Sequence, residues 1–256
     1  MSIFIKNRGN LKLAVIVEKT VENKGLAFVM HGLGGFKEQP HVKTFADAFL
    51  ESGLNVVRFD TTNSFGESEG NYEEATTTNY YEDLEDVINW AKSQEFYTEP
   101  FFLVGHSLGG ISTAMYAENY PKEVKGVAPI STVVSGKLSL ETYEAEKLEE
   151  WEKTGYLISE SVSKPGMKKK LKWSHIKDRL KHDLLIKADN LTMPVLMIVG
   201  EKDTRTPPKH QKILYEALPG EKEFHIIKDA PHTFRKETQL NEIKNILIKW
   251  IKKFNH

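Results

Sequence analysis

Short apolar runs alternate along this chain with longer amphipathic segments, and this alternation limits the possible folds more than any other feature. The apolar runs predict strands buried on both faces, over Leu26–Met30, Val56–Phe59, Phe101–Val104, Val124–Ile130 and Val195–Val199. The amphipathic segments predict helices over Val42–Ser52, Thr77–Ser93, Gly109–Asn119, Pro208–Leu218 and Lys236–Phe254. Strands that alternate with helices of this length indicate an α/β fold with a doubly wound, mostly parallel sheet flanked by helices. A more evenly alternating stretch, Leu11–Val17, predicts an edge strand.

One segment, residues 133–191, interrupts the alternation, because it contains no strand-like run. It predicts a charged helix over Leu140–Trp151, a break at Lys164–Gly166, and a second helical stretch from Met167 to Lys187. In that second stretch the lysine-rich run at 168–172 is interpreted as a solvated helix face, with contact to an anionic lipid or an anionic substrate as the alternative. We therefore expect a helical cap at 133–191, inserted into a core domain formed by residues 1–132 and 192–256.

Composition excludes several other classes of protein. The 256 residues carry 35 Lys plus Arg and 36 Asp plus Glu, a formal net charge of −1, which argues against a nucleic-acid partner. The absence of cysteine excludes disulfides, thiol nucleophiles and cysteine-bound metals, and fits a reducing cytoplasm. No apolar stretch approaches the roughly 20 residues that span a bilayer. We expect a cytoplasmic protein without a membrane anchor, either a monomer or a homodimer.

The sequence Gly105-His106-Ser107-Leu108-Gly109 follows one predicted strand and precedes a predicted helix. This is the G-x-S-x-G pattern in the strand–turn–helix context that gives it meaning. A sharp turn would lift Ser107 above the sheet, and side chains at the two glycines would collide with neighbouring elements. The hydroxyl would then stand at a helix N-terminus, which favours developing negative charge. The pattern predicts that Ser107 is a nucleophile.

A serine nucleophile requires a base, and the base requires an acid that orients it. Among nine histidines, His232 is the best candidate base, because it lies in a predicted loop between a strand-like run and the last helix. Asp203 follows the strand run at 195–199 and is the favoured acid, while Glu201 and Asp229 are alternatives. The order serine, acid, histidine along the chain is that of the α/β-hydrolase arrangement.

The backbone N–H groups of Leu33 and Leu108 are predicted to form the oxyanion hole. Leu108 directly follows the nucleophile, and Leu33 lies in the loop His31-Gly32-Leu33-Gly34-Gly35 after the strand run at 26–30. Glycines in that loop would let its backbone approach a substrate closely. A phosphate-binding loop is excluded, because no Lys-Ser or Lys-Thr follows at the required spacing.

These motifs together make the chain resemble the α/β-hydrolase superfamily over nearly its whole length. It most resembles small bacterial and archaeal serine esterases of the cinnamoyl (feruloyl) type, which share the sequence Arg58-Phe59-Asp60 and a cap of similar size. The resemblance implies hydrolysis of small to medium esters through an acyl-enzyme on Ser107, with no cofactor and no metal. Monoacylglycerol lipase, thioesterase and acyl-peptidase activity remain alternatives with the same triad, as does a non-catalytic binding protein on the same fold.

The pocket for a small-molecule ester is harder to read from the sequence. The cap carries four aromatic side chains that would suit an aromatic or medium acyl group if they face Ser107. The alternative for each of them is that it only attaches the cap to the core. His31 and His106 lie within the backbone motifs and are candidates for lining the pocket or supporting it. The pocket candidates are thus His31, His106, Tyr143, Trp151, Tyr156 and Trp173.

Overall fold

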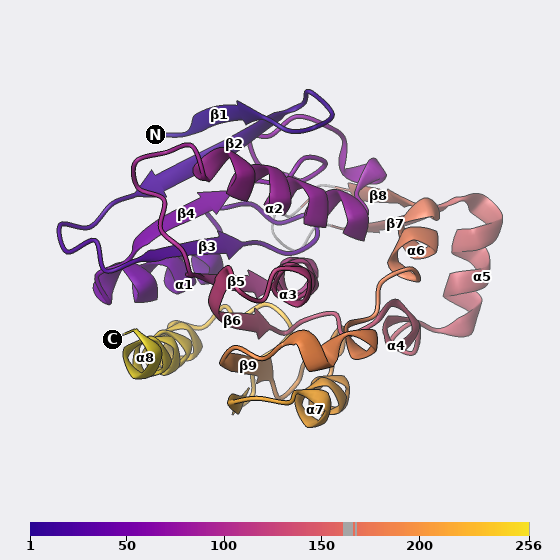
Figure 1. The fold of residues 1–256 in the computed structure, drawn as a ribbon. Helices are drawn as coiled ribbons and strands as arrows, with labels where there is room; N and C mark the ends of the chain where they lie inside the picture. Colours follow the sequence, from indigo (N-terminus) through magenta and orange to yellow (C-terminus); the bar gives the residue numbers. More distant parts are fainter. Residues whose placement is uncertain (161–165, 167, 256) are drawn as a thin grey trace.

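The computed structural model describes residues 1–160, 166 and 168–255, and its centre is one eight-stranded sheet (Figure 1). The strands lie in the order β1-β2-β4-β3-β5-β6-β9-β10. From β4 to β10 neighbouring strands are parallel, whereas β2 is antiparallel to both β1 and β4. The bounds are β1 Ile3–Lys6, β2 Lys12–Glu18, β3 Leu26–Met30, β4 Asn55–Phe59, β5 Phe101–His106, β6 Val124–Ile130, β9 Val195–Gly200 and β10 Lys222–Ile227. The predicted α/β class and mostly parallel sheet are confirmed.

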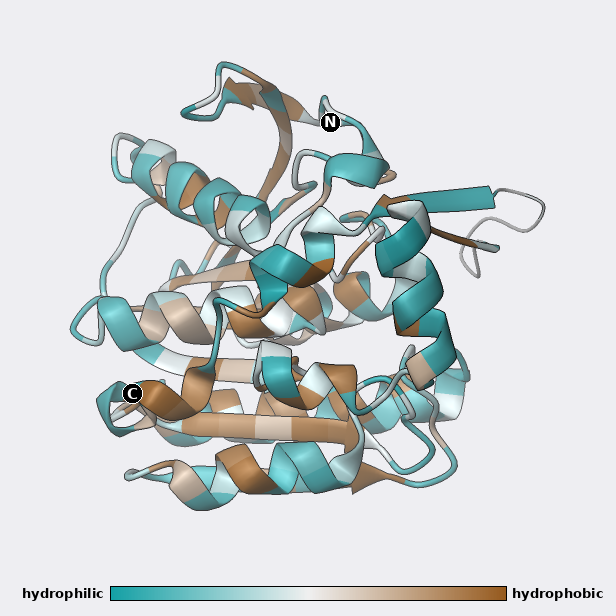
Figure 2. Ribbon diagram, turned by 90° about the vertical axis from the view of Figure 1, so that its right-hand side faces the viewer, coloured by the Kyte–Doolittle hydropathy of each residue, from teal (hydrophilic) through white to brown (hydrophobic). Residues whose placement is uncertain are grey.

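Helices cover both faces of this sheet (Figure 2). The side chains of the strands alternate between two apolar cores. Phe28 and Leu103 point into the core beneath α2, α3 and α7, whereas Val29 and Val104 point into the core beneath α1 and α8. Burial on both faces explains why these strands are nearly continuous apolar runs in the sequence. The helices are α1 Pro40–Glu51, α2 Thr77–Ala91, α3 Leu108–Asn119, α7 Pro208–Ala217 and α8 Glu237–Phe254.

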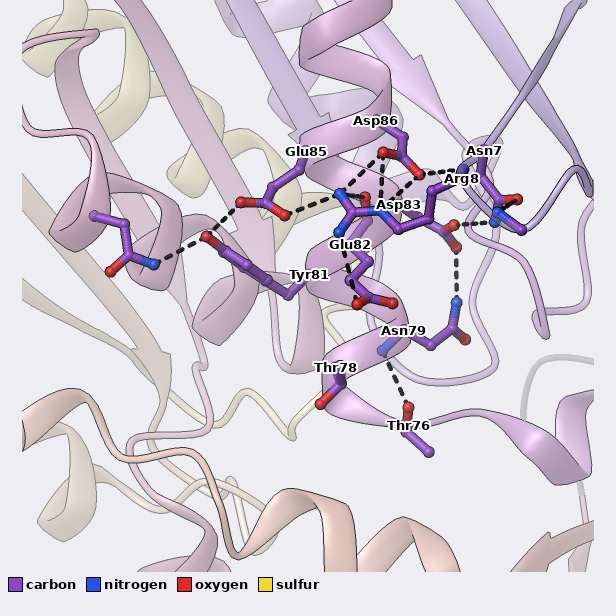
Figure 3. A network of polar contacts seen from close by, with 12 residues as sticks. Asn7, Arg8, Thr76, Thr78, Asn79, Tyr81, Glu82, Asp83, Glu85 and Asp86 are labelled. Atoms are coloured by element: carbon purple, nitrogen blue, oxygen red, sulfur yellow. Dashed lines mark hydrogen bonds and ion pairs between the residues drawn. The ribbon is translucent and has the colours of Figure 1, made fainter.

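The predicted edge strand is not at the edge. It corresponds to β2, and the short strand β1 pairs with its outer side, from Ile3 opposite Val15 to Lys6 opposite Lys12. The turn after β1 is joined to α2, where the Arg8 guanidinium donates hydrogen bonds to the carboxylates of Glu85 and Asp86 at 2.9 Å (Figure 3). β1 is four residues long and exposes Ile3 and Phe4, so it lacks the apolar pattern that identifies a buried strand.

Between β6 and β9 the chain leaves the sheet and forms the segment expected to be a cap, which we call the insertion (residues 133–191). It is not purely helical, because an antiparallel hairpin occupies its middle. In Figure 1 its helices and its hairpin lie together beyond the ends of α2 and α3, whereas its two 3-10 turns contact α3 and α7. Its elements are α4 Gly136–Leu140, α5 Ala145–Thr154, β7 Tyr156–Glu160, β8 Lys168–Lys172, α6 Ser174–Arg179 and the 3-10 turns η2 Leu184–Ile186 and η3 Ala188–Asn190.

Two helix predictions in the insertion are therefore wrong. The helix expected over Leu140–Trp151 is divided by a non-helical link at 141–144, and the one expected from Met167 begins as strand β8. Strand β8 is stabilised by contacts distant in sequence: Leu171 pairs with Leu157, and the Trp151 indole N–H donates to the Leu171 carbonyl at 3.0 Å. A five-residue lysine-rich run has too little periodicity to reveal such partners. Within the expected break, Lys164 and Pro165 lie outside the described residues.

Candidate active site

Ser107 lies in the sharp turn between β5 and α3, in a backbone conformation that only a constrained site maintains. Its φ of 56° and ψ of −111° are far from the helix that begins at Leu108. A Cβ at Gly105 would come within 2.2 Å of the Gly109 carbonyl oxygen, and a Cβ at Gly109 within 2.4 Å of the His31 carbonyl oxygen. Both glycines are thus required because the turn is packed against α3 and the loop after β3.

The side chains of Ser107, His232 and Asp203 form one hydrogen-bonded chain. The distance from Ser107 Oγ to His232 Nε2 is 3.0 Å, and the distance from His232 Nδ1 to Asp203 Oδ2 is 2.9 Å. Since a carboxylate only accepts hydrogen bonds, Nδ1 carries the proton and Nε2 is free to accept the one on Ser107. This is the arrangement in which a serine can be deprotonated as it attacks.

Asp203 is fully buried behind His232 and is held by four hydrogen bonds. Besides His232, its carboxylate accepts from the Arg205 N–H at 2.8 Å, the Thr206 N–H at 2.9 Å and the Thr206 hydroxyl at 2.8 Å. Burial alone would raise the pKa of Asp203, but the hydrogen bonds from His232 and Thr206 and the charge of His232 hold it well below its usual range. The carboxyl group is therefore ionised at neutral pH.

The two alternative acids are occupied elsewhere. The Glu201 carboxylate accepts a hydrogen bond from the Asp229 N–H at 2.9 Å, and the Asp229 carboxylate pairs with Lys202. Neither carboxylate contacts His232 within the part of the chain that is described. The geometry thus favours Asp203.

Two backbone N–H groups beside Ser107 are unoccupied. Among the described residues, no acceptor is bonded to the N–H of Leu33 or of Leu108. The loop that carries Leu33 is held by the Tyr80 hydroxyl, which accepts from the Gly34 N–H at 3.1 Å. Two unbonded donors next to a nucleophile are what an oxyanion hole requires.

His31 supports this loop from below and does not line the pocket, contrary to one expectation. It is fully buried, and its Nε2 accepts a hydrogen bond from the Thr61 N–H at 3.0 Å. Its Nδ1 therefore carries the proton and donates to the Gly32 carbonyl at 2.8 Å. Burial lowers the pKa of His31 and keeps it neutral.

His106 lines the pocket and also holds the loop of His232. Its Nε2–H donates to the His232 backbone carbonyl at 2.8 Å, and the two imidazole rings lie 4.8 Å apart. Burial, followed by the charge of His232, lowers the pKa of His106 to about 3, so it remains neutral. His106 is therefore a positioning residue in this geometry.

A pocket of about 230 Å³ opens above Ser107, between the core and the insertion. Of the six predicted lining residues, His106 and Tyr143 border it, whereas the other four do not: His31, Trp151, Tyr156 and Trp173. Trp151 is buried within the insertion and Trp173 packs against it, with ring centroids 5.6 Å apart. Tyr156 lies on the outer face of the hairpin, where the Lys170 ammonium sits 3.7 Å from its ring centroid. These three aromatic residues stabilise the insertion.

The sequence analysis missed most of the polar wall of the pocket. His41, for which no role was expected, borders it beside His106, with ring centroids 4.6 Å apart. The missed residues also include Tyr72, Lys169, Arg179, Arg205 and Arg235. Arg205 and Arg235 had a usable signal, because they follow Asp203 and His232 by two and three positions, and Lys169 lies in the lysine-rich run for which an anionic substrate was the alternative.

Other candidate sites are weaker. A depression of about 680 Å³ between β10 and α8 contains none of the predicted site residues. Within the described residues, no three histidine or acidic side chains are grouped so that they could bind a metal ion. In the same part of the chain, no helix is both long and apolar enough to cross a membrane.

Comparison with known proteins adds a family and a fold. The family Hydrolase_4, described as serine aminopeptidase S33, matches residues 21–182, a span that contains Ser107 but neither Asp203 nor His232. An uncharacterised 31.7 kDa Escherichia coli protein from the traX–finO intergenic region is 28% identical over 239 residues, covering 81% of this chain and 82% of its own.

Two solved structures illustrate the fold. Est1E from Butyrivibrio proteoclasticus with bound ferulic acid superposes with a TM-score of 0.83 at 19% identity, covering 98% of each chain. The monoacylglycerol lipase of Paleococcus ferrophilus superposes with a TM-score of 0.76 at 21% identity, covering 94% of this chain and 99% of its own. Both have the architecture described above.

Proposed function

The chain belongs to the Hydrolase_4 (serine aminopeptidase S33) family of the α/β-hydrolases, and from this premise we propose that it hydrolyses small to medium carboxylic esters with Ser107, His232 and Asp203. The observation that carries the proposal is the continuous hydrogen-bonded chain from Ser107 Oγ to the buried Asp203 carboxylate. The chain is a serine hydrolase, and esterase and lipase structures are among its structural neighbours. The ester specificity and the triad are what we propose.

In the proposed mechanism Ser107 Oγ attacks the ester carbonyl carbon while its proton moves to His232 Nε2. The imidazolium is stabilised by Asp203, to which it donates from Nδ1. The carbonyl oxygen becomes an oxyanion that accepts hydrogen bonds from the N–H groups of Leu33 and Leu108. His232 then returns the proton to the leaving alcohol, and water activated by the same histidine releases the acid from Ser107.

The insertion is proposed to act as the cap of this site. Leu157 and Leu171, one from each strand of the hairpin, border the pocket together with Tyr143. A pocket of about 230 Å³ with one apolar side favours a small or medium acyl group, including an aromatic one of the cinnamoyl kind, over a long chain. The absence of cysteine supports a cytoplasmic location.

The test is hydrolysis of 4-nitrophenyl esters of increasing acyl length and of methyl ferulate, by the wild type and by Ser107→Ala. We expect activity to be highest on short and medium esters and to fall at least about 10³-fold in Ser107→Ala. Ser112→Ala is the matched control, because Ser112 Oγ bonds only its own helix, at the Leu108 carbonyl. Faster cleavage of amino-acid 4-nitroanilides than of any ester would overturn the ester assignment, and full activity in Ser107→Ala would overturn the mechanism.

A further inference from the structure

The wall of the Ser107 pocket is positively charged. Four of its described lining residues are cationic, and none is an aspartate or a glutamate. The four are Lys169 from β8, Arg179 from α6, Arg205 from the loop after β9, and Arg235 from the loop before α8. Asp203, the nearby acid, lies behind His232 and is already held by four hydrogen bonds. The chain as a whole is almost neutral, so this concentration of one sign is local.

Lys169 owes its position to the alternation of the β7–β8 hairpin. Ser159 pairs with Lys169 and Leu157 with Leu171, and all four side chains border the pocket. Two other lysines of the same strand, one and three positions after Lys169, behave differently. Lys170 and Lys172 point to the outer face and form ion pairs with Glu73 and Glu74. The pocket lysine therefore differs from Lys170 and Lys172 in having no carboxylate partner among the described residues.

Arg179 is the most informative of the four, because it is 7% exposed and its Nε has no hydrogen-bond partner among the described residues. One guanidinium N–H donates to His175 Nε2 at 2.6 Å. His175 cannot balance the charge of Arg179, since its own Nδ1–H donates to the Ala75 carbonyl and burial lowers its pKa to about 3. Arg179 borders the pocket and has no carboxylate partner among the described residues, so an anionic group bound in the pocket would balance its charge.

The remaining two cations are presented by the catalytic loops themselves. Neither Arg205 nor Arg235 forms an ion pair with a carboxylate in the described part of the chain. The cations also act on each other: burial, and then the charge of Arg205, lowers the pKa of Lys169. Like charges gathered around a partly desolvated pocket destabilise the free protein unless something negative binds between them.

We propose that the natural substrate is an ester that carries a negatively charged carboxylate or phosphate group, bound by Lys169, Arg179 and Arg205 while Ser107 attacks the ester bond. This rests on the proposed function and specifies its substrate class. The exposed guanidinium of Arg205 suits two oxygens of one anionic group, and Arg179 and Lys169 supply further donors at the same pocket. A carboxylate and a phosphate would both be recognised by these cations. The experiment therefore tests one substrate pair for each anion.

The experiment compares substrate pairs that differ in a charge and little else. Mono-4-nitrophenyl adipate is compared with its neutral methyl ester, by release of nitrophenolate corrected for spontaneous hydrolysis. The phosphate pair is 1-octanoylglycerol 3-phosphate and 1-octanoylglycerol, by release of octanoate. We expect kcat/KM to be roughly tenfold higher, or more, for the charged member of at least one pair, because charge-assisted hydrogen bonds are stronger than neutral ones. The pair in which the charged member is preferred identifies the anion.

Single substitutions locate the effect. Lys169→Gln and Arg205→Gln should each lower the charged-to-neutral ratio of kcat/KM about fivefold or more. Lys170→Gln is the matched control on the same strand, and it should leave the ratio unchanged because Lys170 faces outward. Equal ratios in Lys169→Gln, Arg205→Gln and the wild type would overturn the assignment of these residues.

Binding separates this proposal from the proposed function. Mono-4-nitrophenyl adipate and its methyl ester are titrated into Ser107→Ala by calorimetry, which needs no turnover. Tighter binding of the anion supports the charged pocket even if no ester is hydrolysed. Hydrolysis of neutral esters without any preference for either anion, in rate or in binding, overturns the charged-substrate proposal and leaves the esterase proposal intact.

Discussion

The loops after β5, β9 and β10 and the insertion border the same pocket, but they are constructed differently. In the loops the reacting atoms are held by backbone geometry: Ser107 has a positive φ, and the Asp203 carboxylate accepts four hydrogen bonds. In the insertion, single side chains of a two-stranded hairpin and a short helix face the pocket, and Lys169 contacts the Tyr72 ring but no carboxylate in the described chain. We infer that the loops determine the chemistry, whereas the insertion, together with Arg205 of the loop after β9, determines which substrate is bound.

Substitution of Asp203, the acid in the loop after β9, should cause the largest loss of activity. Asp203→Asn keeps the shape but loses the charge that stabilises the His232 imidazolium, so kcat should fall roughly 10²–10⁴-fold on every ester. Glu201→Gln and Asp229→Asn are matched controls, because these carboxylates do not contact His232 and should retain near wild-type activity. Steady-state kinetics decide the matter. A larger loss in either control than in Asp203→Asn would reassign the acid.

The different construction of the two regions also explains what could be predicted from the sequence. Few residue types can form the sharp turn at Ser107, so Gly105 and Gly109 marked its position in the sequence. The acid and the histidine could then be sought after it, in the order typical of the fold. The core strands were predictable because burial on both faces produces continuous apolar runs. The fold class needed no further information.

The insertion was predictable as a departure from the alternation but not in its structure. Strand β8 is stabilised by its pairing with β7 and by the hydrogen bond from Trp151. The sequence of residues 168–172 predicts neither contact. The pocket residues Lys169 and Arg179 are brought beside Ser107 only by the folded chain, and lysines two positions apart look alike in the sequence. The aromatic residues expected to bind the substrate, Trp151 and Trp173, pack against each other instead.

A change of pH should have a smaller effect, on the preference for anionic over neutral esters, to which Lys169 of the insertion contributes. Because burial and the charge of Arg205 lower the pKa of Lys169 from its ordinary value of 10.5, Lys169 loses its proton at a lower pH than an exposed lysine. The preference for anionic over neutral esters should therefore weaken as the pH rises above neutrality, by a factor of a few between about pH 7 and pH 10. The ratio of kcat/KM for the adipate pair measures it.

The control for this titration is Lys169→Gln, which has no group to titrate at that position. Its charged-to-neutral ratio should be low and should change less with pH than that of the wild type. A ratio that declines equally in both proteins would assign the pH dependence to another cation or to the substrate, and would remove Lys169 from the binding of the anion.

The central claim, that Ser107 is a nucleophile activated by His232, is tested most directly by covalent labelling. The folded protein is incubated with a fluorophosphonate, which reacts with serines activated by a base, and the modified peptide is identified by mass spectrometry. The account predicts one label per chain on Ser107, with none there in Ser107→Ala and labelling greatly slowed in His232→Ala. An unlabelled wild type, or a label on another serine that persists in Ser107→Ala, would contradict it.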